Sequence, residues 1–184
     1  MSEISVEELE RLERFAEKMR EHTKKRQQMK RALKSITTLI FEQAGFTGTC
    51  PRFRRLKPDR YDLFMFDFCR GHDGFSIQVG QCAPDDIGYP PLGEHPVELL
   101  KLVPLEKLDP EHLRIDQRAR VQPRQGVLPG DFFEYGDAQT VEDYRRVAHG
   151  AVPFVEKTIA GFEDYARFAK VERLNKTMHC IRLV

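Results

Sequence analysis

The residues best suited by type to acid–base chemistry are a histidine and an adjacent carboxylate, His72-Asp73. A positioned histidine is the commonest general base in enzymes, and a carboxylate can orient it. This pair stands between Gly71 and Gly74, where polar residues are favoured by turn geometry alone. We therefore expect a turn here rather than a catalytic dyad.

Metal binding and cofactor chemistry are poorly supported by the spacing of the potential ligands. No two cysteines form a C-x-x-C pair, the spacing typical of zinc sites. Asp85 and Asp86 are adjacent and point apart, with no third ligand placed near them. The sequence also has no phosphate loop, dinucleotide fingerprint or G-x-S-x-G motif. We predict no metal, no cofactor and no catalytic residues, and favour a non-enzymatic protein.

Three runs of alternating apolar and polar residues predict an antiparallel meander. The runs are 50–56, 61–70 and 75–82, and turn residues separate them at 57–60 and 71–74. Pro58 presets the backbone of the first turn, and glycines at both ends of the second suit positive φ angles. The three strands should therefore be neighbours in one sheet.

The strand register follows from placing all large apolar side chains on one face. Phe64, Phe66 and Phe68 share a face because side chains alternate along a strand. With four-residue loops, Phe53 lies opposite Phe64, and Phe66 lies opposite Val79. We expect helices to cover this face.

The same register places Arg55 directly opposite Asp62, on the apolar face near the 57–60 turn. We predict a structural ion pair that is partly buried, because helices cover the face while the turn stays wet. Removing one partner should then cost roughly 1–2 kcal/mol.

Two other groups of residues are candidates for partner binding. The second sheet face is mixed and polar, and it is either a solvated face or a recognition surface. The long loop at 122–138 is rich in aromatic residues, and it either covers the sheet edge or forms a contact loop or pocket wall. The candidate partner-binding residues are Arg52, Arg54, Asp67, Gln78, Phe132, Phe133 and Tyr135.

Helical patterns precede the meander. Ser5–His22 has a capping-box start and a narrow apolar stripe, and Gln28–Ala44 ends at Gly45. The two form either one rod or a pair with a break near Thr23. Acidic residues early and basic residues near the end of the first helix suit its dipole. The basic segment 24–34 therefore indicates a solvated helix end more than a nucleic-acid site, since no aromatic residue is interleaved for stacking.

Beyond the meander, alternation predicts a fourth strand at Leu113–Val121. A helix should begin at Thr140 and end at Gly150, and a second should open at Pro153. Lys176–Val184 is a candidate final strand.

Composition sets the outer limits of these interpretations. The chain has 184 residues and a formal net charge of +1, so no global field attracts nucleic acid or membrane. It lacks a long apolar run, and its acidic start does not match a secretory signal. We predict a cytoplasmic, single-domain α+β protein spanning 1–184, with 1–28 as a helical extension. Its antiparallel meander sheet should have four to five strands between long N- and C-terminal helices.

Short motifs near the meander resemble a bacterial family described as a domain of unknown function. They are Gly45-Phe46 at a helix end, Phe53 with Arg55, the acid Asp62, and Phe75–Gly80. The resemblance covers 50 of the 184 residues, from Leu33 to Cys82, and implies an α+β fold. Some proteins of this type look like immunity proteins that bind and block a cognate toxin.

The sequence therefore favours a non-enzymatic cytoplasmic binding protein. The resemblance implies, more narrowly, a bacterial immunity protein whose partner is a toxin domain. Two alternatives stay open. One is a ligand binder or enzyme with a pocket between the sheet and the 122–138 loop, and the other is nucleic-acid binding through 24–34. The oligomeric state is left open.

Overall fold

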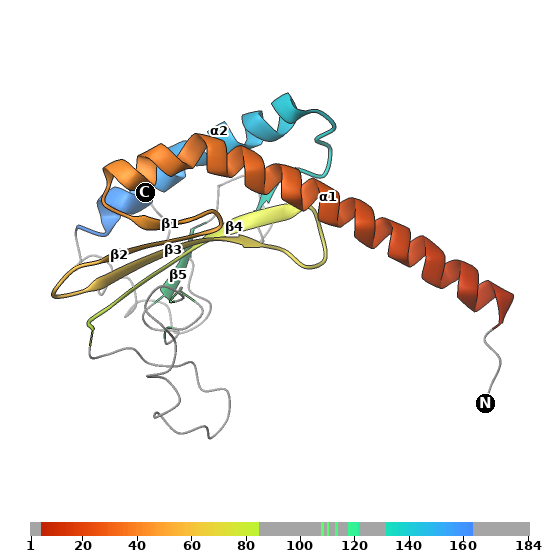
Figure 1. Ribbon diagram of the computed structural model, residues 1–184, viewed down its shortest axis with the longest axis horizontal. Coiled ribbons are helices and arrows are strands. Elements are labelled where there is room, and N and C mark those ends of the chain that lie inside the picture. The colour runs from red at the N-terminus through yellow and green to blue at the C-terminus, as the bar shows by residue number, and fades with distance from the viewer. Residues whose placement is uncertain are drawn as a thin grey trace, which may run out of the picture.

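The computed structural model describes residues 5–84, 108, 110, 113, 118–121 and 132–163, with backbone only at 118–121. Two helices pack on one face of an antiparallel sheet (Figure 1). This arrangement confirms the predicted α+β class. The elements are α1 Val6–Gln43, β1 Thr47–Thr49, β2 Arg52–Leu56, β3 Tyr61–Phe68, β4 Gly74–Cys82, β5 Arg118–Val121, β6 Phe133–Glu134 and α2 Val141–Gly161.

The sheet is a meander in which neighbours in the chain are neighbours in space. Its order is β1-β2-β3-β4-β5, and β6 also pairs with β4. Between β2 and β3, Phe53 pairs with Phe64 and Arg55 with Asp62, as predicted. The backbone N–H of Lys57 donates to the Arg60 carbonyl at 2.8 Å and closes the predicted turn.

Between β3 and β4 the predicted register is wrong by two residues. Phe66 pairs with Ile77 rather than Val79, because the four-residue loop begins one position earlier than predicted. The Cys69 N–H donates to the Gly74 carbonyl at 3.0 Å, so Gly74 belongs to β4. Gly74 does not have a positive φ. It lies close to the His72 ring, and an added Cβ would be 2.6 Å from that ring. A shift of two keeps every side chain on its predicted face.

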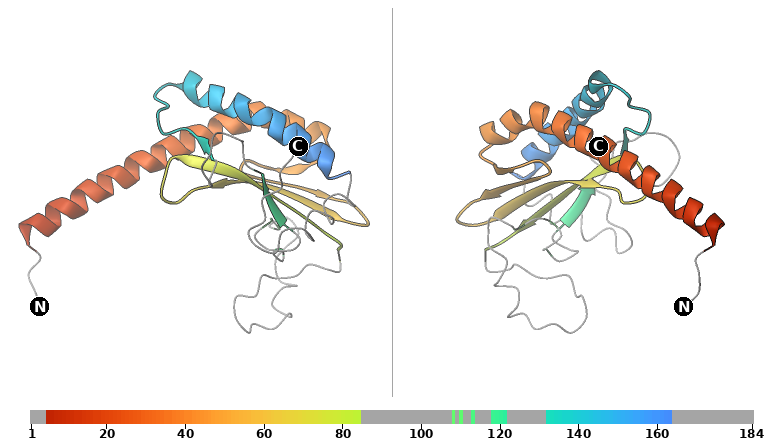
Figure 2. Two further views of the ribbon diagram at one scale, coloured as in Figure 1. Left: turned by 180° about the vertical axis from the view of Figure 1, so that it is seen from behind. Right: turned by 45° about the vertical axis from the view of Figure 1, so that its right-hand side comes forward.

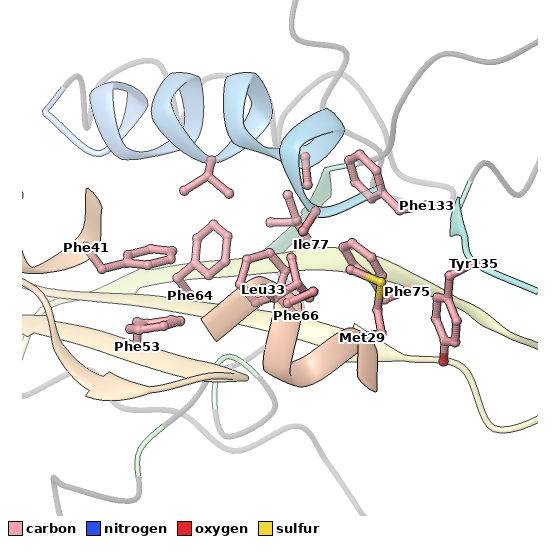
Figure 3. Packing of buried hydrophobic residues seen from close by; sticks show 14 of the residues in the cluster. Met29, Leu33, Phe41, Phe53, Phe64, Phe66, Phe75, Ile77, Phe133 and Tyr135 are labelled. Carbon is pink, nitrogen blue, oxygen red and sulfur yellow. The ribbon is translucent and has the colours of Figure 1, made fainter. Parts of the chain in front are cut away.

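A cluster of aromatic rings fills the space between the helices and the sheet (Figure 3). Phe41 of α1 is stacked on Phe53 with ring centroids 3.8 Å apart, and it is in edge contact with Phe64 at 4.7 Å. Further along the sheet, Phe75 stacks on Phe133 at 4.9 Å. The predicted core face is therefore the face that the helices cover.

The α1 helix is continuous through Thr23, which settles the question of one helix or two. It ends in a Schellman motif, in which the Phe46 N–H donates to the Phe41 carbonyl at 2.9 Å. Gly45 adopts a φ of +78°, and the Phe41 and Phe46 rings meet across the turn. Because the helix runs on to Gln43, the basic segment that follows Arg20 is not a helix end, contrary to our expectation.

The α2 helix is also continuous, so the predicted end at Gly150 and new start at Pro153 are wrong. Proline in a helix interior removes one hydrogen bond, to the carbonyl four residues earlier. That carbonyl belongs to His149, and both His149 and Pro153 are exposed, so water can replace the lost donor. The predicted start is confirmed, since Thr140 and Asp143 form a capping box.

The second sheet face is less solvated than its composition suggests. Leu63 and Met65 are buried on it, and Leu63 packs in a small cluster with Cys82, Leu108 and Leu113. The described strand β5 is shorter than the predicted Leu113–Val121. The predicted strand at 176–184, most of the 122–138 loop and Asp85-Asp86 lie outside the described residues.

If Phe41 organises the core, truncating it should destabilise the protein far more than truncating its neighbour Leu39. Phe41 is fully buried, whereas Leu39 is 61% exposed. We expect Phe41→Ala to lower the free energy of unfolding by about 3–5 kcal/mol. Leu39→Ala on the same helix should stay within about 0.5 kcal/mol. Urea denaturation followed by circular dichroism measures both, and equal losses would contradict this packing.

Candidate functional site

The predicted polar residues of the second sheet face do lie together. Arg52 is exposed, and Arg54, Asp67 and Gln78 are half-buried. The Gln78 side-chain amide donates to the Asp67 carboxylate at 2.7 Å. Their role in partner binding stays a prediction.

The aromatic residues predicted for the same role are placed differently. Phe133 and Tyr135 are core residues, 7% and 1% exposed, because β6 pairs with β4 and turns both rings inward. Their burial argues against surface contact and against a pocket lined by these rings. Phe132 is half-buried, with its ring centroid 4.7 Å from that of His72.

Asp62 is more deeply buried than predicted, with no exposed surface at all. One of its oxygens, Oδ2, accepts a hydrogen bond from Arg55 Nε at 2.8 Å. The other, Oδ1, accepts from Gln81 Nε2 at 2.6 Å and lies 3.3 Å from Arg60 Nε. The predicted ion pair is confirmed, but it is the inner part of a larger charged cluster.

This charged cluster connects the sheet to the ends of both helices. Arg55 Nη1 donates to the Ala44 carbonyl at the end of α1 at 3.0 Å, and its guanidinium lies over the Phe46 ring. Glu163, just after α2, is 2.8 Å from Arg55 Nη2 and also accepts hydrogen bonds from Lys57 and Arg60. These hydrogen bonds and the Arg55 charge hold the pKa of Glu163 below its ordinary value.

A second charged cluster lies at the other end of the β3–β4 hairpin. The partner of Asp73 is His22 of α1, rather than its sequence neighbour His72. Lys25 Nζ is 3.5 Å from the same carboxylate and donates to the Gly136 carbonyl at 2.8 Å. Arg26 donates to the Cys69 carbonyl at 2.7 Å, so all three side chains of α1 hold the hairpin. Sequence reasoning missed this cluster because 51 residues separate the histidine from the carboxylate.

A shallow groove of about 250 Å³ lies beside this cluster, between α1 and the start of α2. Glu21 and Lys24 line one side and Tyr144 the other, and burial raises the pKa of the Tyr144 hydroxyl. Burial also raises the pKa of the nearby Tyr135 hydroxyl, helped by the Asp73 charge, so neither hydroxyl ionises at neutral pH. The groove therefore presents mixed charges without an activated nucleophile.

The Cys50 thiol is not activated either. Burial raises the pKa of the Cys50 thiol to about 12, which keeps it protonated at neutral pH. Among the residues that the structure describes, no three histidine, cysteine or acidic side chains converge as a metal site.

The first half of α1 projects away from the rest of the described structure as an arm (Figures 1 and 2). Every residue from Ser5 to Glu21 is exposed. We call residues 6–20 the arm, and its apolar stripe faces solvent. The stripe consists of Val6, Leu9, Leu12, Phe15 and Met19, which are 76%, 50%, 58%, 62% and 41% exposed. The sequence revealed this stripe and predicted a helical extension over 1–28, but it did not reveal that the stripe faces solvent.

Part of the basic segment 24–34, a candidate for nucleic-acid binding, has a structural role. Lys25 is engaged with Asp73, and the Lys30 ammonium lies 5.2 Å from the centroid of the Phe68 ring. These contacts direct two of its charges toward the body of the protein.

Comparison with protein-family models, with curated proteins and with solved structures finds no significant match to this chain. The resemblance suggested by the short motifs therefore stays a prediction. Among the described residues, no helix is both long enough and apolar enough to cross a membrane.

The burial of Asp62 predicts a larger effect than the sequence alone suggested. Arg55→Met and Asp62→Leu should each lower the free energy of unfolding by roughly 3–5 kcal/mol, because each leaves a buried charge with fewer partners. The double variant should cost less than the sum of the singles by about 1 kcal/mol or more. Asp59→Asn, in the exposed turn nearby, is the control and should be almost neutral. A strictly additive cycle from urea denaturation would refute this coupling.

Glu163 should make stability depend on pH in a defined direction. Its pKa is lowered in the folded state, so its contribution is complete above the unfolded pKa of about 4.3 and is lost as pH falls through the folded pKa. The stability difference between wild type and Glu163→Gln should therefore be constant near neutral pH and vanish in acid. Thermal unfolding of both proteins at intervals of about one pH unit between pH 3 and pH 7 measures this difference. A difference that grows toward acid would show that the sign is wrong.

Proposed function

We propose that this chain is a non-enzymatic protein that works by binding another protein, and that the arm is its binding element. The observation that carries the proposal is the solvent-facing apolar stripe. Contiguous exposed apolar surface on a folded protein marks an interaction site more often than chance exposure. Leu9, Leu12 and Met19 lie within about 80° of one another around the helix, with Val6 and Phe15 on either side, and together they make such a surface.

The geometry of the arm suits recognition by a helix. Peptide-like helices bind grooves or other helices through apolar anchors spaced three and four residues apart. The arm has that spacing between Val6 and Met19. It is also the continuation of a helix anchored by Met29, Leu33 and Phe41, all fully buried. The arm is therefore helical before it binds, which reduces the entropy lost on association.

The charged groups support a binding role rather than catalysis. Asp62 and Asp73 are held by neighbouring basic side chains that connect secondary-structure elements. Groups used in this way stabilise the fold.

A second candidate function keeps the binding role but places it on the sheet: a cytoplasmic immunity protein that blocks a bacterial toxin. Its support is the resemblance of the helix-end and strand motifs to that class. In this form the toxin domain would contact the second sheet face, where Arg52 is exposed and Arg54, Asp67 and Gln78 are half-buried. The affinity of a toxin that binds there should be unchanged by substitutions in the arm. The Arg52→Glu substitution should lower it.

Affinity capture from the native organism tests the role of the arm. Leu9→Gln with Leu12→Gln removes two anchors and keeps helix-forming residues. We expect this variant to lose most of the protein captured by the wild type. Glu10→Gln with Glu17→Gln is the matched control, because it introduces the same residues on the opposite side of the arm. Equal capture by all three proteins, with equal circular dichroism spectra, would exclude the arm as the binding element.

A further inference from the structure

We propose that the partner of the arm is the arm of a second copy of this chain, and that the two pair antiparallel as a short coiled coil. This inference rests on the proposed function, because it names the partner for the same surface. It follows from the spacing of the apolar residues, the distribution of charge and the length of helix that is exposed.

The spacing of the apolar residues matches a coiled-coil seam. Leu9, Leu12, Ala16 and Met19 follow one another at intervals of three, four and three residues. These are the a and d positions of a heptad, which face a partner helix. Phe15 then occupies a g position, which flanks the seam beside the small Ala16.

Charge changes sign along the arm. Between residues 7 and 13 there are four glutamates and one arginine, whereas residues 14–20 hold three basic residues and one glutamate. The helix dipole does not explain this pattern, since it acts only on the first and last turns. The basic residues are in the middle of α1, and its last turn has none. Such a pattern requires another explanation.

An antiparallel pair supplies that explanation. A twofold axis between two copies brings the acidic half of each arm beside the basic half of the other. A parallel pair would instead place acidic beside acidic and basic beside basic. The arm is therefore complementary to itself in one orientation, which favours a second copy over an unrelated helix.

The register of this pair matches the length of the exposed helix. Leu9 meets Met19 of the second copy, and Leu12 meets Ala16. Val6 of the second copy then lies opposite His22, where α1 first contacts the β3–β4 hairpin. The exposed part of α1 is thus covered along its whole length. The bodies of the two copies lie at opposite ends, because each arm projects away from its own body (Figure 2).

One contact in this arrangement is unfavourable. Glu13 occupies a position flanking the seam, close to the twofold axis, and so lies near Glu13 of the second copy. Together with a seam of only two heptads, this repulsion limits the affinity. We expect a reversible dimer rather than a permanent one.

Sedimentation equilibrium of the full chain, from micromolar to millimolar concentration, tests for the dimer. The wild type should show a reversible monomer–dimer equilibrium. Leu9→Gln with Leu12→Gln should weaken it at least about 30-fold, because four apolar contacts are lost per dimer. The control, Leu39→Gln, replaces an exposed leucine of α1 outside the arm and should stay within about threefold. A wild type that is monomeric at every concentration would overturn the inference.

Cross-linking tests the orientation. Under mild oxidation, the double variant Leu9→Cys with Met19→Cys should form a covalent dimer faster than the wild type, whose own cysteines are the background. Leu9→Cys alone should not exceed that background, because the two Leu9 positions lie at opposite ends of an antiparallel pair. Rapid cross-linking of Leu9→Cys alone would show a parallel pair and refute this model.

These outcomes separate the inference from the proposed function. If the wild type is monomeric but captures another protein that the Leu9→Gln with Leu12→Gln variant does not, the arm binds a different partner and only the inference fails. If the chain is monomeric and capture does not depend on the arm, both fail.

Discussion

The buried carboxylate of Asp62 is the constraint on which the packing of this chain depends. A charge with no exposed surface is tolerated when hydrogen bonds and opposite charges surround it. Arg55 from β2 and Gln81 from β4 provide those hydrogen bonds. The same two side chains reach the carbonyl groups of Ala44 and Phe162, at the ends of α1 and α2. Satisfying one carboxylate therefore positions both helices over the aromatic core.

This constraint also explains which parts of the fold could be predicted. The β2–β3 register was correct because two signals agreed: the apolar face and the opposed charges of Arg55 and Asp62. For β3–β4 the apolar face alone was available, and it is unchanged by a two-residue shift. The position of that turn depends on His22 and on the close approach at Gly74, which are tertiary contacts.

The candidate site was harder to predict than the fold, for a similar physical reason. The apolar stripe and the charge reversal of the arm are visible in the sequence, but their exposure is not. An amphipathic helix usually packs its stripe on the rest of the chain. Here α1 reaches the sheet near His22 and packs its later residues, Met29 to Phe41, on the aromatic core. Phe133 and Tyr135 show the reverse case, in which a loop judged from its composition places its rings in the core.

The basic segment of α1 shows how one run of like charges can serve two surfaces. Lys25 and Arg26 face the body, where they hold Asp73 and the Cys69 carbonyl. Lys18, Arg20 and Lys24 remain exposed on other sides of the same helix. Because Lys25 and Arg26 are held against the hairpin, the exposed basic side chains contribute most to the field beside the arm. This positive field would attract an acidic helix end that approaches along the stripe. The first turns of α1 are themselves acidic, with Glu7, Glu8 and Glu10.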